Sequence, residues 1–148
     1  MTALLTAAVA IWLLWIALCL VLMITARPRG ASFNGFRVII PYELREVLDA
    51  DELEAVRQHE LGHCHHWHVW INFALNCFFV KPSAERRRCQ EIEADDFAAA
   101  RVGRKSLESA LRKLTGVDGW PVPPTLDGLR IARLQPGWPR ALDTALLR

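Results

Sequence analysis

The chain has 148 residues, of which 52% are apolar and 23% charged, and its formal net charge is +2. This composition excludes a disordered or collagen-like chain and fits either one globular domain or a small domain with a membrane segment. A balance so close to neutral, with both signs spread along the chain, argues against a nucleic-acid partner. All five histidines lie between His59 and His68, so the candidate chemistry is concentrated in one short segment.

The first predicted element is a membrane helix. From Ala7 to Ile24 every residue is apolar. With the uncharged residues beside it, this run reaches the roughly 20 residues that span a bilayer. We therefore expect a transmembrane helix within residues 1–26 that contacts lipid through residues 3–26. A cleaved signal peptide is the alternative, but such a peptide carries an early basic residue and a shorter apolar run.

Basic residues follow this segment. Arg27, Arg29 and Arg37 all precede the first acidic residue, Glu43. The sequence predicts a single-pass membrane protein. Because positive charge beside a span stays on the cytoplasmic side, its C-terminal domain is expected in the cytoplasm.

A short β element is predicted next. Asn34-Gly35 separates two short apolar stretches, a signal for a tight hairpin whose stronger strand is residues 36–40, ended by Pro41. A lone edge strand is the alternative. In either case the strand edge is a candidate for holding an extended peptide.

Helices are predicted for most of the remaining chain. Asp49 and Glu52 form an approximate capping box for a helix from about Ala50 to Trp67. Residues 67–80 are an apolar run that is too short to span a membrane. This run is predicted to be either a buried core helix or an interfacial segment lying against the bilayer.

Three further helices are expected, each bounded by proline, serine or glycine signals. They cover residues 84–102, 104–115 and 125–134, with a loop at residues 117–124. The predicted organisation is therefore a transmembrane helix (1–26), a core (27–116), and a loop with a C-terminal helical segment (117–148). The fold class is mainly α with a small β element.

The predicted helix from Ala50 contains His59-Glu60-Leu61-Gly62-His63, an H-E-x-x-H motif. Two histidines four residues apart lie on one helical face, so both imidazoles can reach a single zinc ion. Glu60, between them, can then polarise a water molecule as a general base. The motif predicts one Zn²⁺ per chain.

A catalytic zinc site needs a third protein ligand, and Glu91 is the best candidate. Asp95 lies four residues further along the same helical face, where it can accept the other ring N–H of a ligating histidine and so fix its tautomer. Glu93 points to another side of this helix and cannot share that role. The alternative is a solvated acidic patch near Arg87 and Arg88.

The remaining three histidines follow the motif directly. His66 follows His63 by about one turn, but three ligands on successive turns would diverge from one metal ion. His65, His66 and His68 are therefore expected to be solvated or to support a ligand from behind. Tyr42, the only tyrosine, is a candidate for oxyanion stabilisation.

At these residues the chain resembles the gluzincin metallopeptidases, within the membrane-linked group of HtpX-type heat-shock proteases, CAAX prenyl proteases and BlaR/MecR-type sensor proteases. The stretch GFRVIIPYELREVLDADELEAVRQHELGH is similar to the BlaR/MecR type. EIEADDFAAARVGRKSLESALRKL and PPTLDGLRIARLQ are more similar to the HtpX type. The resemblance covers about residues 33 to 135. It differs from the family pattern in having one membrane helix and in carrying Pro124-Thr125-Leu126 where T-H-P is usual.

The resemblance implies a minimal zincin-like metallopeptidase core behind the N-terminal helix. His59, His63 and Glu91 would bind zinc, Glu60 would be the general base, and Asp95 would support a histidine ligand. The implied function is a membrane-anchored zinc endopeptidase acting on protein or peptide substrates.

Three alternatives are kept. ImmA/IrrE-type proteases, which act on repressors, also combine HELGH with a downstream E-x-E-A helix. A non-catalytic membrane adaptor would retain the metal for structure and bind a partner through residues 69–80. A latent enzyme would have its cleft covered by residues 117–124 or by the C-terminal tail.

Overall fold

The computed structural model describes residues 2–25, 30–116 and 125–139. Arg27, Arg29, the predicted loop at 117–124 and the chain after residue 139 lie outside the described residues. Within them the chain is mainly helical with one small sheet, as the sequence predicts. The elements are α1 (Thr2–Thr25), β1 (Ser32–Phe33), β2 (Val38–Ile39), α2 (Tyr42–Val47), α3 (Ala50–His65), α4 (His68–Cys77), α5 (Ala84–Val102), α6 (Arg104–Thr115) and α7 (Leu126–Leu134).

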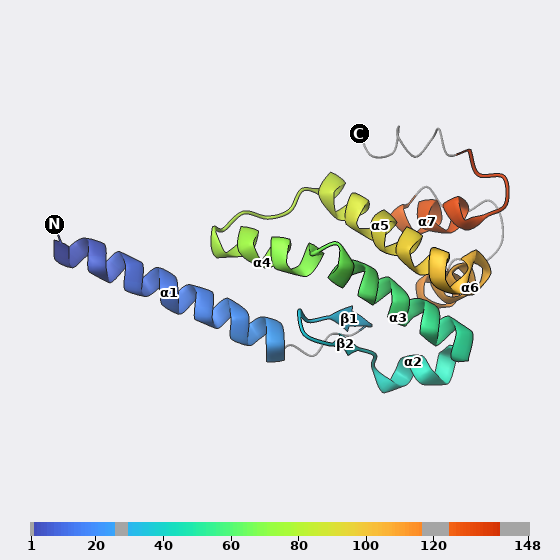
Figure 1. Cartoon of the computed structure of the whole chain (residues 1–148), viewed down its shortest axis with the longest axis horizontal. Helices are drawn as coiled ribbons and strands as arrows, with labels where there is room; N and C mark the ends of the chain where they lie inside the picture. The colour runs from blue at the N-terminus through green and yellow to red at the C-terminus, as the bar shows by residue number, and fades with distance from the viewer. Residues whose placement is uncertain (1, 26–29, 117–124, 140–148) are drawn as a thin grey trace.

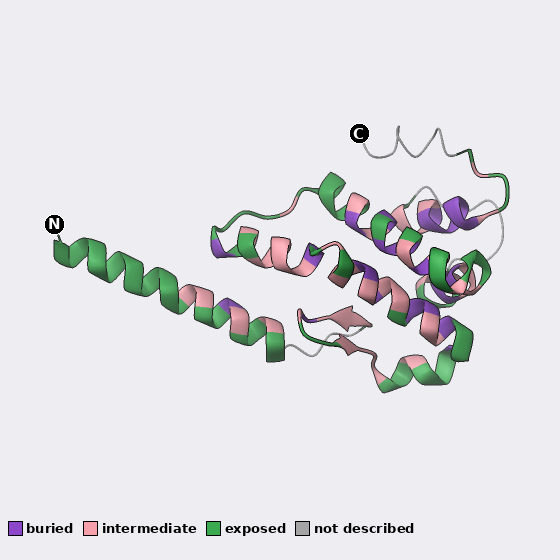
Figure 2. Ribbon diagram, in the orientation of Figure 1, coloured by how far each residue is buried: buried purple, intermediate pink, exposed green. Residues whose placement is uncertain are grey.

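The body of the molecule is built on α3 and α5, which pack side by side, with α6 and α7 completing the core (Figure 1). The described residues that form the main apolar cluster come from these four helices. They are Ala55, Ala98, Leu107, Leu111, Ile131 and Leu134. Figure 2 shows the buried residues gathered along these helices, whereas the outer half of α1 is exposed.

Gly62 allows α3 and α5 to approach each other closely. A Cβ atom at this position would lie 2.8 Å from the Cα of Ala94, which is closer than carbon atoms can pack. Glycine is therefore required where the motif helix crosses α5. This contact brings the H-E-x-x-H segment of α3 against the acidic residues of α5.

The predicted Asn34-Gly35 hairpin is confirmed. β1 and β2 pair antiparallel, with Ser32 opposite Ile39. Gly35 has φ +90°, a conformation that favours glycine, and the Asn34 side chain accepts hydrogen bonds from the next turn amides. The strands are shorter than the predicted run 36–40. Residues 42–47 form α2, a helix that the sequence analysis did not predict.

The capping signals place the helices well. The Asp49–Glu52 capping box begins α3 as predicted. α3 ends at His65 and not at Trp67, because Trp67 adopts a left-handed conformation with φ 60° and separates α3 from α4. Ser83 caps α5, which covers 84–102 as predicted, and Gly116 ends α6.

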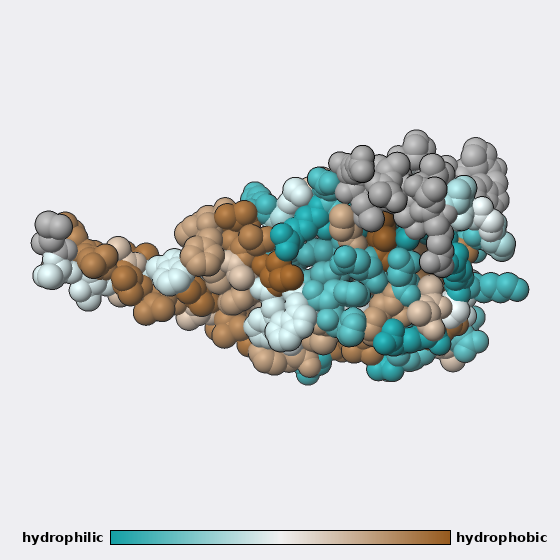
Figure 3. Space-filling model, turned by 45° about the horizontal axis from the view of Figure 1, so that its top comes forward, coloured by the Kyte–Doolittle hydropathy of each residue, from teal (hydrophilic) through white to brown (hydrophobic). Residues whose placement is uncertain are grey.

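α4 packs along α1 and not inside the main core. The Trp12 and Phe78 ring centroids are 5.6 Å apart, and Trp15 stacks on Phe79 with centroids 5.0 Å apart. α1 is long and apolar enough to cross a membrane. In Figure 3 apolar residues continue from α1 onto the adjoining part of the molecule, whereas the body beyond is largely hydrophilic. The prediction of a buried core helix for this segment is wrong, because its neighbour is an exposed apolar helix.

Candidate metal centre

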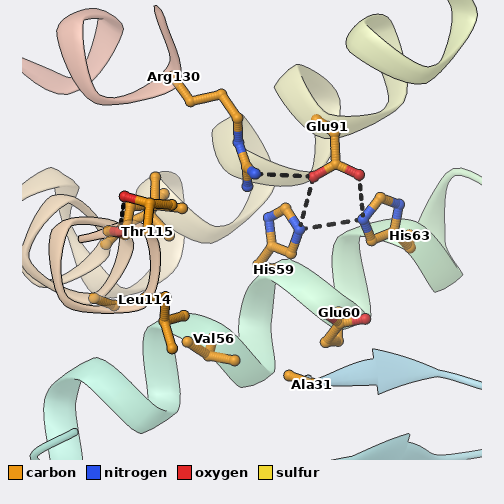
Figure 4. Close-up of a pocket in the computed structure, with 12 residues that line it drawn as sticks. Ala31, Val56, His59, Glu60, His63, Glu91, Leu114, Thr115 and Arg130 are labelled. Atoms are coloured by element: carbon orange, nitrogen blue, oxygen red, sulfur yellow. Dashed lines mark hydrogen bonds and ion pairs between the residues drawn. The ribbon is translucent and has the colours of Figure 1, made fainter. Parts of the chain in front are cut away.

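Three potential ligands from two helices converge on one point. Nε2 of His59 and Nε2 of His63, both on α3, are 3.2 Å apart. The Glu91 carboxylate of α5 lies 3.5 Å from His59 Nε2 and 3.6 Å from His63 Nε2 through its two oxygens. Figure 4 shows the three side chains pointing toward one another across the gap between the helices. The predicted ligand trio is thus brought together by the Gly62 crossing.

This arrangement fits a metal ion with tetrahedral coordination. A zinc ion with ligands at about 2.0–2.1 Å requires ligand atoms about 3.3 Å apart, and the three separations here are close to this value. Two imidazoles and one carboxylate are a donor set that zinc accepts, with a fourth position left for water. The residues present can therefore hold a catalytic divalent metal ion.

Asp95 supports His59 from behind. Its carboxylate is 1% exposed, and Oδ1 lies 2.9 Å from His59 Nδ1, although the ring N–H is not aligned with this oxygen. The contact keeps Nδ1 as the protonated nitrogen and leaves Nε2 to face the metal position. The structure places Asp95 where the sequence analysis expects it.

Arg130 of α7 joins the site, a residue that the sequence analysis missed. Its guanidinium donates two hydrogen bonds to Asp95, of 2.7 and 2.8 Å, and lies 3.1 Å from Glu91. A bidentate arginine pair fixes the orientation of a carboxylate as well as its charge. The sequence shows Arg130 only as one of two arginines in a short predicted helix, and this does not identify its partner.

The carboxylates of the site determine where its protons lie. Burial by itself lowers the pKa of His59, but the carboxylates of Asp95 and Glu91 outweigh it and raise the pKa to about 9. Burial opposes ionisation of Glu91, yet His59 and Arg130 hold its pKa below the ordinary value. Burial and the adjacent positive charge of His59 lower the pKa of His63, so its ring is neutral near pH 7. Without metal, His59 is therefore protonated near pH 7, and a metal ion that binds its Nε2 must displace that proton, whereas His63 and Glu91 are already in the states that metal binding requires.

Glu60 lies beside this cluster and lines the same cavity, whose volume is about 370 Å³. The Glu60 residue is 8% exposed, and burial raises the pKa of its carboxyl. The backbone amide of Phe33 in β1 lies near this carboxyl and partly offsets the effect of burial on its pKa. A buried carboxylate with a raised pKa is suited to accept and return a proton. The remainder of the lining is largely apolar and includes Ala31, Val56, Leu107, Leu111 and Leu114.

A second chain of contacts reaches His63 from α4. Nδ1 of His68 lies 2.9 Å from Nδ1 of His63, and Nε2 of His68 lies 2.8 Å from the Glu93 carboxylate. His68 is 3% exposed. His63 can donate its Nδ1 proton to His68, which then donates its Nε2 proton to Glu93. This orientation leaves His63 Nε2 free to bind a metal ion.

The other predicted candidates take no part in the ligand trio. His65 and His66 lie against the ring of Phe97. His66 also lies close to His68 and Glu93. His68 contacts the Nδ1 side of the His63 ring and not the Nε2 side that faces Glu91. Tyr42 is 70% exposed on α2 and is not among the described residues that line the cavity, so the structure does not support an oxyanion role for it.

Two comparisons with known proteins found similar sequences. Residues 25–86 match the model of peptidase family M48. A segment of 46 residues is 46% identical to protease HtpX homolog 1 of Sulfolobus acidocaldarius. This segment covers 31% of the chain and 15% of that relative. No solved structure matches the chain significantly. The segment that carries the H-E-x-x-H residues is therefore similar to peptidase family M48, and part of the chain is similar to an HtpX homologue.

Proposed function

We propose that the chain is a membrane-anchored, zinc-dependent endopeptidase in which His59, His63 and Glu91 hold the metal ion. The observation that carries this proposal is the convergence of the three ligand atoms, 3.2 to 3.6 Å apart, beside the buried Glu60 in one cavity. Bound zinc would supply a Lewis acid that polarises a peptide carbonyl and lowers the pKa of water.

The residues of the chain account for the other steps. Glu60 accepts the proton of the attacking water and delivers it to the leaving amine. Asp95 and Arg130 keep the His59 ring and the Glu91 carboxylate in position. The apolar part of the cavity, formed by Val56 and the leucines of α6, favours a substrate with an apolar side chain at this place.

The strand beside the site is β1. Ala31 precedes β1 and lines the cavity, and Phe33 contacts Glu60 through its backbone. The sequence analysis favoured residues 36–40 for holding a substrate peptide. β1 is better placed, because it lies directly against the motif helix, and we propose that it holds the peptide in an extended conformation.

In this proposal α1 anchors the enzyme in a membrane as a single-pass helix, and the catalytic domain lies on the cytoplasmic side. The length and apolar composition of α1 support the anchor. The sidedness depends on Arg37 and on two arginines outside the described residues.

The test is metal analysis and a protease assay of the full chain in lipid vesicles, comparing the wild type with Glu60→Gln. The variant should retain about one zinc ion per chain and lose activity by about 10²–10⁴-fold. Glu54→Gln is the matched control, since Glu54 lies on the same helix with a 41% exposed side chain paired to Arg57. Protein without metal, or unchanged proteolysis in Glu60→Gln, contradicts the proposal.

Glu60→Gln also separates this proposal from a non-catalytic adaptor. An adaptor predicts bound zinc with a cellular phenotype that is insensitive to the substitution. No feature of the described residues favours the adaptor or a repressor-directed protease over the general endopeptidase. The latent form depends on residues 117–124 and the tail, which lie outside the described residues.

A further inference from the structure

We propose that α4 and the turn after it, Phe78–Val80, insert into the same bilayer that α1 spans, and that acyl chains cover their exposed apolar side chains. This inference rests on the membrane anchor in the proposed function. It adds a second membrane-embedded segment, which follows the H-E-x-x-H motif directly.

The depth of the segment follows from its contacts with α1. Phe78 and Phe79 pack on Trp12 and Trp15, which lie in the middle of the 24-residue helix. At a rise of 1.5 Å per residue, Trp12 lies about 15 Å from one end of α1 and about 20 Å from the other. If α1 spans a bilayer whose hydrocarbon core is about 30 Å thick, the tip beyond α4 lies near the midplane.

The tip of this segment exposes large apolar side chains, and lipid would cover them at this depth. Phe78 is 64% exposed, Phe79 71% and Val80 49%. Residues 67–80 contain no lysine, arginine, aspartate or glutamate. Three consecutive exposed apolar residues at the end of a helix are unfavourable in water and favourable in hydrocarbon. Figure 3 shows that the apolar surface of this region is continuous with that of α1.

The carbonyl groups of Leu75, Asn76 and Cys77 at the end of α4 are satisfied by protein groups, as hydrocarbon requires. Trp12 Nε1 donates to the Cys77 carbonyl at 3.1 Å, and Trp15 Nε1 lies 3.5 Å from the Asn76 carbonyl. The Leu75 carbonyl accepts bonds from the backbone amides of Phe78 and Val80. This pairing explains why two tryptophans lie mid-span and not at the ends of α1, where interfacial tryptophans are usual.

The polar side chains of α4 are also paired. Asn76 donates to the sulfur of Cys19 at 3.4 Å, and Asn72 exchanges two hydrogen bonds, of 3.0 and 3.1 Å, with Gln90. Side chains that are satisfied in this way can enter a bilayer without the full cost of burying polar groups.

Positive charge returns directly after the turn. Lys81 ends the uncharged run, where the chain turns back from the tip of α4 toward α5 (Figure 1). Arg86, Arg87 and Arg88 are exposed at the start of α5. Basic residues in this position suit the headgroup layer of an anionic membrane.

The experiment uses the unmodified full chain in vesicles of phosphatidylcholine with a minor fraction of phosphatidylglycerol. The vesicles also contain a phosphatidylcholine that carries a photoactivated diazirine in the middle of one acyl chain. Adducts are mapped by mass spectrometry. We expect adducts in residues 2–25 and in residues 67–80, with the yield in both segments at least about fivefold above that in α6 (Arg104–Thr115), which the proposal leaves outside the membrane.

Each other outcome overturns the inference in a distinct way. Adducts in 2–25 without adducts in 67–80 leave the anchor standing and show that α4 lies outside the hydrocarbon or against another protein. Adducts in neither segment overturn the anchor of the proposed function and this inference with it. Zinc content and Glu60-dependent proteolysis, measured on the same samples, show whether the catalytic part of the proposal stands independently.

A pair of variants tests the role of the indole. Trp12→Phe keeps an aromatic ring on Phe78 but removes the donor to the Cys77 carbonyl. We expect it to lower the adduct yield of 67–80 by several-fold and to leave the yield of 2–25 unchanged. Trp67→Phe is the control, because Trp67 is 65% exposed at the start of α4, and it should change neither yield. Equal yields for both variants would show that the indole does not hold α4 in the membrane.

Discussion

Arg130 and Asp95 form a buried two-point ion pair that joins α7 to α5, with hydrogen bonds of 2.7 and 2.8 Å. The same guanidinium lies 3.1 Å from Glu91, so one arginine orients both Glu91, which faces the candidate metal position, and Asp95, which supports His59. The pairs link the C-terminal helix of the described chain to the metal centre, although the two segments are far apart in the sequence.

We expect Arg130→Gln to reduce the free energy of unfolding by about 3–5 kcal/mol, because it leaves the buried Asp95 without its charged partner. Metal affinity should fall as well, since Glu91 loses a contact that orients it. Chemical denaturation and chelator competition measure the two effects. Arg57→Gln is the control, because this arginine forms an exposed pair with Glu54, and a change above about 1 kcal/mol there would contradict the argument.

Gly62→Ala should destabilise the protein by about 1–3 kcal/mol or more, because the added Cβ would meet the backbone of Ala94. Since the crossing of α3 and α5 brings the ligands together, we also expect weaker metal binding. Gly30→Ala is the matched control, since a Cβ at Gly30 meets nothing within 4 Å. Thermal unfolding and zinc titration of both variants decide the point, and equal stability of the two would refute the steric account.

His68→Ala should weaken metal binding about 10–100-fold, because His63 loses the group that fixes its ring. Glu93→Gln should have a smaller effect in the same direction, since it keeps an acceptor for His68. His65→Ala, on the exposed side of α3, should leave the affinity unchanged. Nitrogen chemical shifts of the His63 ring in the zinc-loaded protein report its tautomer, and an unaltered tautomer in His68→Ala would show that His68 only fills space.

We expect the free energy of unfolding to fall in acid, because Glu52 becomes protonated. Burial alone raises the pKa of Glu52, but Lys113, Ser109 and the Asp49 backbone amide outweigh it and hold the pKa below its ordinary value of 4.5. A carboxyl with a lowered pKa stabilises the fold above its unfolded pKa, and this contribution is lost as the pH falls through the folded pKa. Ser109→Ala removes a hydrogen bond of 2.6 Å to Glu52.

The measurement is the free energy of unfolding between about pH 7 and pH 3. Glu52→Gln should be less stable than the wild type at pH 7, and its stability should fall less steeply toward pH 3. Ser109→Ala should lie between the two proteins. Parallel curves for the wild type and Glu52→Gln would show that Glu52 makes no pH-dependent contribution.

Local signals in the sequence determined the elements and the chemistry of the site. The Asp49–Glu52 capping box and Ser83 begin α3 and α5, and Asn34-Gly35 makes the hairpin, because these signals act through neighbouring backbone groups. The spacing of His59 and His63 on one helix follows from helical periodicity alone.

Tertiary packing decided what those local rules do not reach. The position of Glu91 beside the histidines depends on the close crossing at Gly62, and the role of Arg130 depends on how α7 docks on α5. From the sequence, the segment that forms α4 fits either a core helix or an interfacial segment, because an apolar run does not specify what it packs against. Its packing on α1 decided against the core, since contacts between distant segments are set by shape and not by local composition.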